Sequence, residues 1–66
     1  MITDLRPLKK WLMPGDIGML AKEVGISSVQ ASYIISGKSR NWDFVEKFLE
    51  RVERNKSLVD KANNLL

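Results

Sequence analysis

A chain of 66 residues holds one small domain, which buries only about 60% of the surface that its unfolded form exposes. With 44% hydrophobic and 29% charged residues, its composition is that of a folded, soluble domain. The sequence has no Cys and no His, so disulfides, the usual zinc ligands and the usual nucleophile–base pairs are missing. We therefore expect no enzyme activity, no metal, no cofactor and no small-molecule ligand. No apolar run approaches the roughly 18 residues of a membrane span.

The net charge of +3 is unevenly distributed. Residues 1–40 contain six basic and three acidic residues, whereas residues 41–66 contain five of each. No acidic residue occurs between Glu23 and Asp43. This gap is either chance in a short chain or the sign of a surface kept free of anions because a polyanion docks there.

The first helix is predicted by leucines at spacings of three and four residues, which share one helical face. They are Leu5, Leu8 and Leu12. The Pro14-Gly15 pair stops this helix, which we expect over about residues 4–13.

Two more short helices are expected next. Asp16 stands where an N-cap belongs, ahead of an apolar face over about residues 17–24. A serine, Ser27 or Ser28, can cap the following helix, which we expect over about 28–36.

The last third of the chain is also predicted to be helical, with Asn41 as its cap. Ser57 and Asp60 resemble a capping box, which favours a break at 55–57 and a further helix over about 58–65. The alternative is one continuous helix, because apolar residues keep a seven-residue spacing. They are Val45, Val52, Val59 and Leu66.

The fold class that follows is all-α, a compact bundle of four to five short helices forming a single domain over residues 1–66. Large apolar side chains should form its core, namely Leu12, Phe44, Phe48 and Leu49. Trp11 and Trp42 are expected to cover that core rather than to stack on bases.

Residues 17–36, IGMLAKEVGISSVQASYIIS, contain small and apolar residues at fixed spacings, a glycine at a turn, and a Gly-Lys pair just beyond. The matching positions are Leu20, Ala21, Gly25, Ile26, Ala31, Ile34 and Gly37-Lys38. This stretch resembles the helix-turn-helix of phage-repressor (Cro-like, XRE-type) DNA-binding proteins. The resemblance implies a lambda-repressor-like fold and a cytoplasmic, nucleoid-associated bacterial or phage regulator of transcription. It would bind double-stranded DNA sequence-specifically and act as a repressor by occupying its site.

The exposed face of the second helix of this motif is the candidate for base contacts. At roughly 100° per residue, Ala31 and Ile34 share the inward side and the opposite side is free. The free side chains are Ser28, Val29, Ser32 and Tyr33, with Gln30 at the flank. In such motifs the N-terminal part of the second helix meets base edges in the major groove.

This face lacks Arg, Lys and Asn, the usual long side chains that read bases. Val29 and Tyr33 can therefore pack against another protein instead, and packing is the interpretation that we favour for Ile35. A protein-interaction module, antitoxin- or adaptor-like, is accordingly the alternative function for the same fold.

Phosphate contacts are expected at both ends of that helix, from Ser27, Lys38, Arg40 and Asn41. The resemblance places the loop after the second helix along the DNA backbone. A guanidinium such as that of Arg40 can fork onto one phosphate, and free N–H groups at a helix start can receive another. The alternative for Lys38 and Arg40 is two solvated cations.

The segment 57–66 has too many apolar residues for a free tail. They are Leu58, Val59, Ala62, Leu65 and Leu66. We expect this segment to form a weak homodimer, as a two-fold arrangement doubles the contacts of a single motif. The alternative is that these residues close the core of the monomer.

Overall fold

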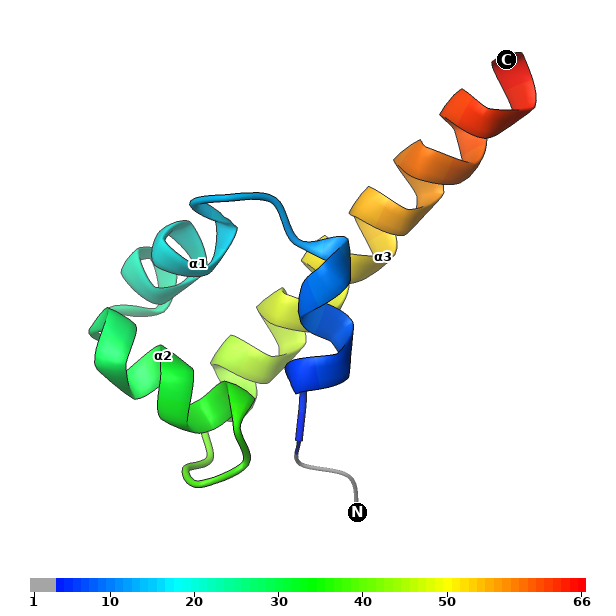
Figure 1. Ribbon diagram of the computed structural model, residues 1–66. Coiled ribbons are helices and arrows are strands. Elements are labelled where there is room, and N and C mark those ends of the chain that lie inside the picture. Colours follow the sequence, from blue (N-terminus) through cyan, green and yellow to red (C-terminus); the bar gives the residue numbers. More distant parts are fainter. Residues whose placement is uncertain (1–3) are drawn as a thin grey trace.

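The computed structural model describes residues 4–66, and this part of the chain folds into four helical segments with no strand (Figure 1). A 3₁₀ helix, η1 (Arg6–Trp11), is followed by three α-helices, α1 (Asp16–Val24), α2 (Ser28–Ile35) and α3 (Trp42–Leu65). The all-α prediction is thus confirmed. None of the described helices is both long enough and apolar enough to cross a membrane.

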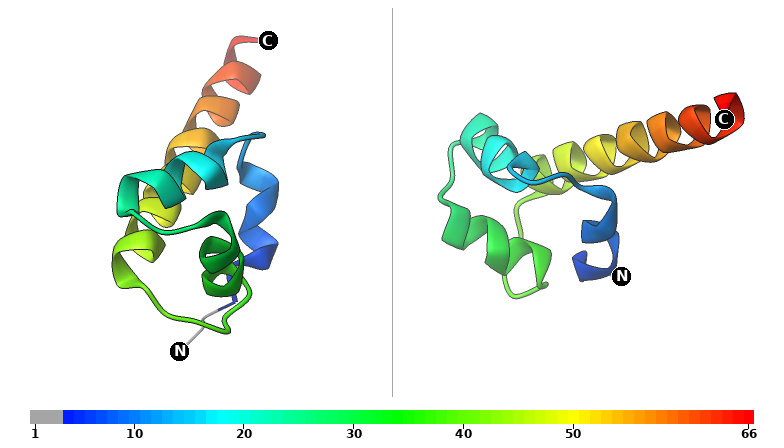
Figure 2. Two further views of the ribbon diagram at one scale, coloured as in Figure 1. Left: turned by 90° about the vertical axis from the view of Figure 1, so that its left-hand side faces the viewer. Right: turned by 45° about the horizontal axis from the view of Figure 1, so that its top comes forward.

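The core lies where α1, α2 and the first half of α3 meet, with η1 against one side of α3 (Figures 1 and 2). Its centre is the pair Phe44 and Phe48, whose rings are fully buried with centroids 6.1 Å apart. The other buried apolar residues are Leu5, Leu20, Ala21, Ala31, Ile34, Ile35 and Val52. A small core of this kind leaves little stability to spare, so each buried residue matters.

The turn between α1 and α2 follows the prediction. Gly25 ends α1 with φ +84°, a left-handed conformation that L side chains rarely adopt, and its N–H donates to the carbonyl of Ala21. The N–H of Ile26 donates to the same carbonyl, and the side chain of Ile26 packs against the core. Ala21, whose side chain is buried at this corner, is small enough to let α2 lie close to α1.

The first two predicted helices need correction. The segment 4–13 forms only the six-residue η1, which ends at Trp11 and is followed by Leu12 in an extended conformation. Pro14 also disfavours the helical region for Met13, the residue directly before it, so the helix does not continue to residue 13. Asp16 is not a cap: Gly15, with φ +90°, occupies that position, and Asp16 is the first residue of α1.

The predicted break at 55–57 is wrong, because α3 runs unbroken from Trp42 to Leu65. Its C-terminal part, residues 56–65, projects beyond the rest of the molecule in every view (Figures 1 and 2). We call these ten residues the overhang. The structure consequently measures 40 × 25 × 16 Å, and the apolar residues of the overhang are exposed instead of closing the core.

Two further core predictions are wrong, for Trp42 and Leu49. Trp42, the first residue of α3, is 56% exposed, and Leu49 lies on the outer side of the same helix. Both sit away from the α3 face that Phe44 and Phe48 turn inward. Trp11 and Leu12, in contrast, are partly buried and pack against the core.

A buried polar network, which we call the latch, ties the N-terminal segment to α1 and α3. The side-chain amide of Asn55 donates to the carbonyl of Trp11 at 2.8 Å and to the Asp16 carboxylate at 3.2 Å. That carboxylate also accepts the N–H of Met13 at 2.9 Å, and the Arg51 guanidinium lies 3.7 Å away. Asp16 and Asn55 are both buried, so these bonds replace water that neither group can reach.

The charge of the latch depends on pH. The hydrogen bond from the N–H of Met13, together with Asn55 and Arg51, holds the pKa of Asp16 below its ordinary value against the opposing effect of burial. The carboxylate therefore stabilises the folded state above the pKa of an unfolded Asp, about 4, and this stability is lost as the pH falls through the lower, folded pKa.

We predict that Gly25→Ala destabilises the protein by about 1–2 kcal/mol, because the left-handed conformation is strained for alanine. Gly18 lies inside α1, where an added methyl group meets nothing within 4 Å and φ is not positive. Gly18→Ala should therefore raise the free energy of unfolding, by up to about 1 kcal/mol. Chemical denaturation of both variants measures these opposite signs; a shared sign would contradict the assigned turn.

We predict that Asn55→Ala lowers the free energy of unfolding by about 1–3 kcal/mol, because the carbonyl of Trp11 loses its buried partner. A further prediction is that Asp16→Asn is less stable than the native chain near neutral pH and loses less stability on acidification. Thermal melts from about pH 6 to about pH 3 compare how the stability of the variant and of the native chain changes with pH. Equal slopes would show that Asp16 does not carry the pH dependence.

Candidate nucleic-acid interface

The two sides of α2 are sharply different. Ala31, Ile34 and Ile35 are buried and fix the helix to the core, and the packing predicted for Ile35 is confirmed. All five residues predicted to face bases are exposed, namely Ser28, Val29, Gln30, Ser32 and Tyr33. Their surface carries hydroxyl, methyl and amide groups and no charge.

The N-terminus of α2 is held by a capping box, which the sequence had indicated only in part. The hydroxyl oxygen of Ser27 accepts the N–H of Gln30 at 3.1 Å, and the side-chain carbonyl of Gln30 accepts the N–H of Ser27 at 2.9 Å. This arrangement assigns the cap to Ser27 and leaves the Ser28 hydroxyl free. Only the amide NH₂ of Gln30 remains available for another molecule.

The loop after α2 is wound tightly onto the end of that helix. The carbonyl of Tyr33 accepts the N–H of Lys38 at 2.9 Å and that of Ser39 at 3.2 Å. Gly37, with φ +85°, makes this reversal possible. The backbone thus places Lys38, whose side chain is exposed, close to the C-terminal end of the α2 face.

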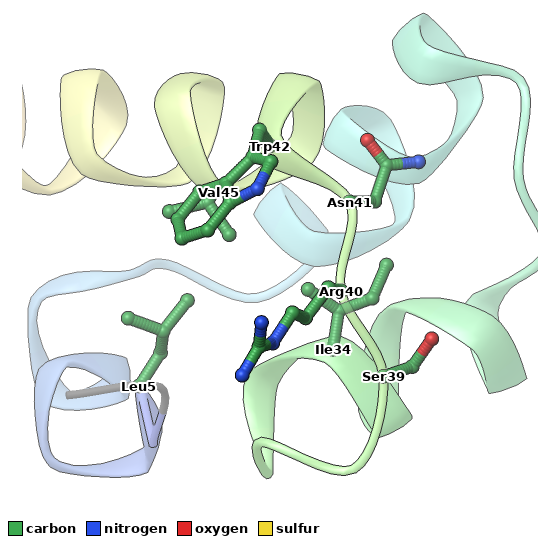
Figure 3. A pocket seen from close by; sticks show the side chains of 7 residues that line it. All are labelled: Leu5, Ile34, Ser39, Arg40, Asn41, Trp42 and Val45. Carbon is green, nitrogen blue, oxygen red and sulfur yellow. The ribbon is translucent and has the colours of Figure 1, made fainter. Parts of the chain in front are cut away.

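Arg40 and Asn41 lie between α2 and α3. Asn41 caps α3 as predicted, its side-chain oxygen accepting the N–H of Phe44 at 3.1 Å. Figure 3 shows the guanidinium of Arg40 turned toward Leu5, beside an apolar hollow that Trp42 also lines. The hydroxyl of Ser39 points to the other side in the same view. Arg40 therefore extends from the loop toward η1, and Lys38 is the cation nearer to α2 along the chain.

Acidic side chains gather elsewhere, in a groove between α1 and α3. Its lining residues are Glu23, Val24, Asp43, Glu46, Lys47 and Glu50. The gap in acidic residues from 24 to 42 is visible in the sequence, but the position of Glu23 beside the acidic face of α3 is not, since it depends on helix packing. In the described part of the chain, no three of these carboxylates approach closely enough to hold a metal ion. The α2 face and its loop are thereby left as the acid-free side.

Two lysines also contact an aromatic ring outside α2. The ammonium groups of Lys10 and Lys56 lie 5.6 and 5.5 Å from the centroid of the Trp11 indole. The spacing of these residues in the sequence gives no signal for the pair, which forms only because η1 packs against α3.

Comparisons of the chain with protein-family models, with curated proteins and with solved structures find no match.

We predict that Ser27→Ala lowers the free energy of unfolding by about 0.5–2 kcal/mol, because it removes the cap of α2. Ser28→Ala is the matched control: the neighbouring hydroxyl makes no hydrogen bond among the described residues, so stability should stay nearly unchanged. Denaturant titration of both variants measures the difference. An equal loss in the two would contradict the assignment of the cap.

Proposed function

We propose that this chain is a sequence-specific, double-stranded DNA-binding regulator that represses by occupying its site, with α2 in the major groove. One observation carries the proposal: α2 is fixed to the core on one side and exposes an uncharged polar face on the other. Its position after a glycine turn supports the same conclusion, because helix-turn-helix proteins present their second helix in this way.

The chemistry of the α2 face suits permissive reading of bases. The hydroxyls of Ser28 and Ser32 donate or accept, so each discriminates weakly between base edges. The methyl groups of Val29, which is 60% exposed, can contact the methyl group of thymine. Tyr33, half exposed at the C-terminal end of this face, could bond a phosphate or a base edge with its hydroxyl.

Affinity would come from the ends of the face. Lys38 supplies a cation beside α2, and Arg40 and the first N–H groups of α3 supply anion-binding groups farther along the loop. The Ser27 hydroxyl is committed to the cap, so its role toward phosphate is to orient the start of α2. With few cations, few counterions are released, so binding should be weak at physiological salt and should weaken further as the salt concentration rises.

The second candidate function is a protein-interaction module without DNA. It is favoured by the exposure of Val29 and Tyr33 on a face that carries no charged reader. Exposed aromatic and aliphatic side chains of this kind also anchor protein–protein contacts. Binding to DNA of mixed sequence at low and moderate salt separates the two, because only a DNA binder loses affinity as salt rises.

We predict that substitutions can separate base contacts, which set the preference among sites, from phosphate contacts, which set the affinity for all sites. Val29→Ala and Tyr33→Phe should change the preferred sites selected from a random DNA pool, by about 1–3 kcal/mol of discrimination at a contacted position. Lys38→Ala and Arg40→Ala should weaken all sites about equally and flatten the salt dependence by about one unit each, since phosphates are the same at every step.

The matched control is Lys61→Ala, which removes the same charge from the overhang and should leave the salt dependence unchanged. If the α2 variants keep the native preference and the loop variants keep the native affinity, α2 does not face DNA. The protein-interaction function would then be the better proposal.

A further inference from the structure

Val29 is the most outward residue of α2. At roughly 100° per residue, the buried side chains of Ala31, Ile34 and Ile35 are centred about 165° away from it around the helix. The isopropyl group of Val29 is 60% exposed and lies in the first turn of α2, the part that meets base edges in a helix-turn-helix protein. A molecule that docks on the middle of the α2 face therefore meets methyl groups first.

Hydroxyl groups flank Val29 on the same side of the helix. Ser32 and Ser28 lie about 60° and 100° from it, and a hydroxyl can either donate or accept a hydrogen bond. Each serine thus accommodates the O4 acceptor of thymine as well as the N4 donor of cytosine. Gln30 is less free, because its side-chain carbonyl already accepts the N–H of Ser27. The paired donor and acceptor that a free amide offers to adenine are therefore not both available.

The charged side chains that recognise guanine and cytosine are missing from α2. Arg or Lys pairs with guanine, and Asp or Glu accepts from the amino group of cytosine. The eight residues of α2, SVQASYII, include none of these four. Beyond the helix, Lys38 follows its end, and the guanidinium of Arg40 is turned toward Leu5 (Figure 3). The apolar group on the major-groove edges of the base pairs is the 5-methyl group of thymine, which matches the methyl groups of Val29.

We propose that α2 selects its DNA sites by the 5-methyl groups of pyrimidines, with Val29 as the residue that contacts them. This inference rests on the proposed DNA binding and deepens it. 5-Methylcytosine carries its methyl group on the same ring carbon as thymine, and the flanking hydroxyls accommodate either base. Binding therefore responds to cytosine methylation, because methylated cytosine can replace thymine opposite Val29 whereas unmethylated cytosine cannot.

The test uses a duplex selected from a random DNA pool by the native chain. Each thymine is replaced in turn by deoxyuridine, which lacks the methyl group and keeps the hydrogen-bonding groups of the base. Burial of one methyl group contributes about fourfold to affinity, so deoxyuridine opposite Val29 should weaken binding of the native chain by about this factor. Val29→Ala, a change at an exposed position, should bind the two duplexes alike.

A second replacement at the same position tests the response to methylation. Cytosine there should weaken binding of the native chain at least about fourfold, and 5-methylcytosine should restore most of this loss. The matched control is Lys38→Ala, which removes a proposed phosphate contact. It should weaken binding to every duplex and leave the ratio between methylated and unmethylated duplexes unchanged, because phosphates are the same in both.

Two outcomes separate this inference from the proposed function. If the chain binds a selected site but no deoxyuridine replacement weakens binding, or if Val29→Ala keeps the response, the inference is wrong and the proposed function stands. A native chain that binds no duplex contradicts the proposed function itself, and the inference is then wrong as well.

Discussion

Asn55 holds together three parts of the chain that share few other polar contacts. Its amide nitrogen uses one hydrogen for the carbonyl of Trp11 and the other for the carboxylate of Asp16, so η1, α1 and α3 meet at one side chain. Every buried side-chain nitrogen and oxygen in the described residues has a partner. Without the latch, the N-terminal segment would rely on apolar packing and on one backbone hydrogen bond, from the N–H of Leu5 to the carbonyl of Ile35. The residues that pack are Leu5, Leu8, Trp11 and Leu12.

The placement of α2 depends on this arrangement. α2 packs on α1 and on the first half of α3, and those two helices are joined by the shared core and by the hydrogen bond from Asn55 to Asp16. Local hydrogen bonds then hold the two ends of α2. The Ser27 side chain caps its start, and the carbonyl of Tyr33 accepts the N–H groups of the loop that follows its end. The proposed reading of bases by α2 needs a rigid support of this kind, because weakly selective contacts discriminate only if their positions do not vary.

Most of the fold could be predicted from the sequence because it depends on local spacing. The bounds of α1 and α2, the left-handed Gly25 and the inward side of α2 all follow from apolar periodicity and turn chemistry. The exposure of the candidate base-facing residues follows for the same reason. What local spacing leaves open is which surface the exposed face meets, since hydroxyls and methyl groups suit several partners.

Several of the errors share one physical source. Asp16 was expected to cap α1, and a helix break near Asn55 was expected from the pair Ser57 and Asp60. The side chain of Asn55 instead bonds to Asp16 and to the carbonyl of Trp11, which are 39 and 44 positions away in the sequence. The Asp16 carboxylate also accepts the N–H of Met13. The Glu23 contribution to the acidic groove was missed for the same reason, because tertiary packing alone brings it to α3.

The latch contacts main-chain atoms of the N-terminal segment, and this affects which substitutions the segment tolerates. The carbonyl of residue 11 and the N–H of residue 13 are present whatever amino acid occupies those positions, except that proline at 13 would remove the donor. The side chain of Met13 is 58% exposed and takes no part in the bond. In diverged chains that keep this architecture, the amino acid at position 13 should therefore vary widely. Positions 16 and 55 should change together or not at all.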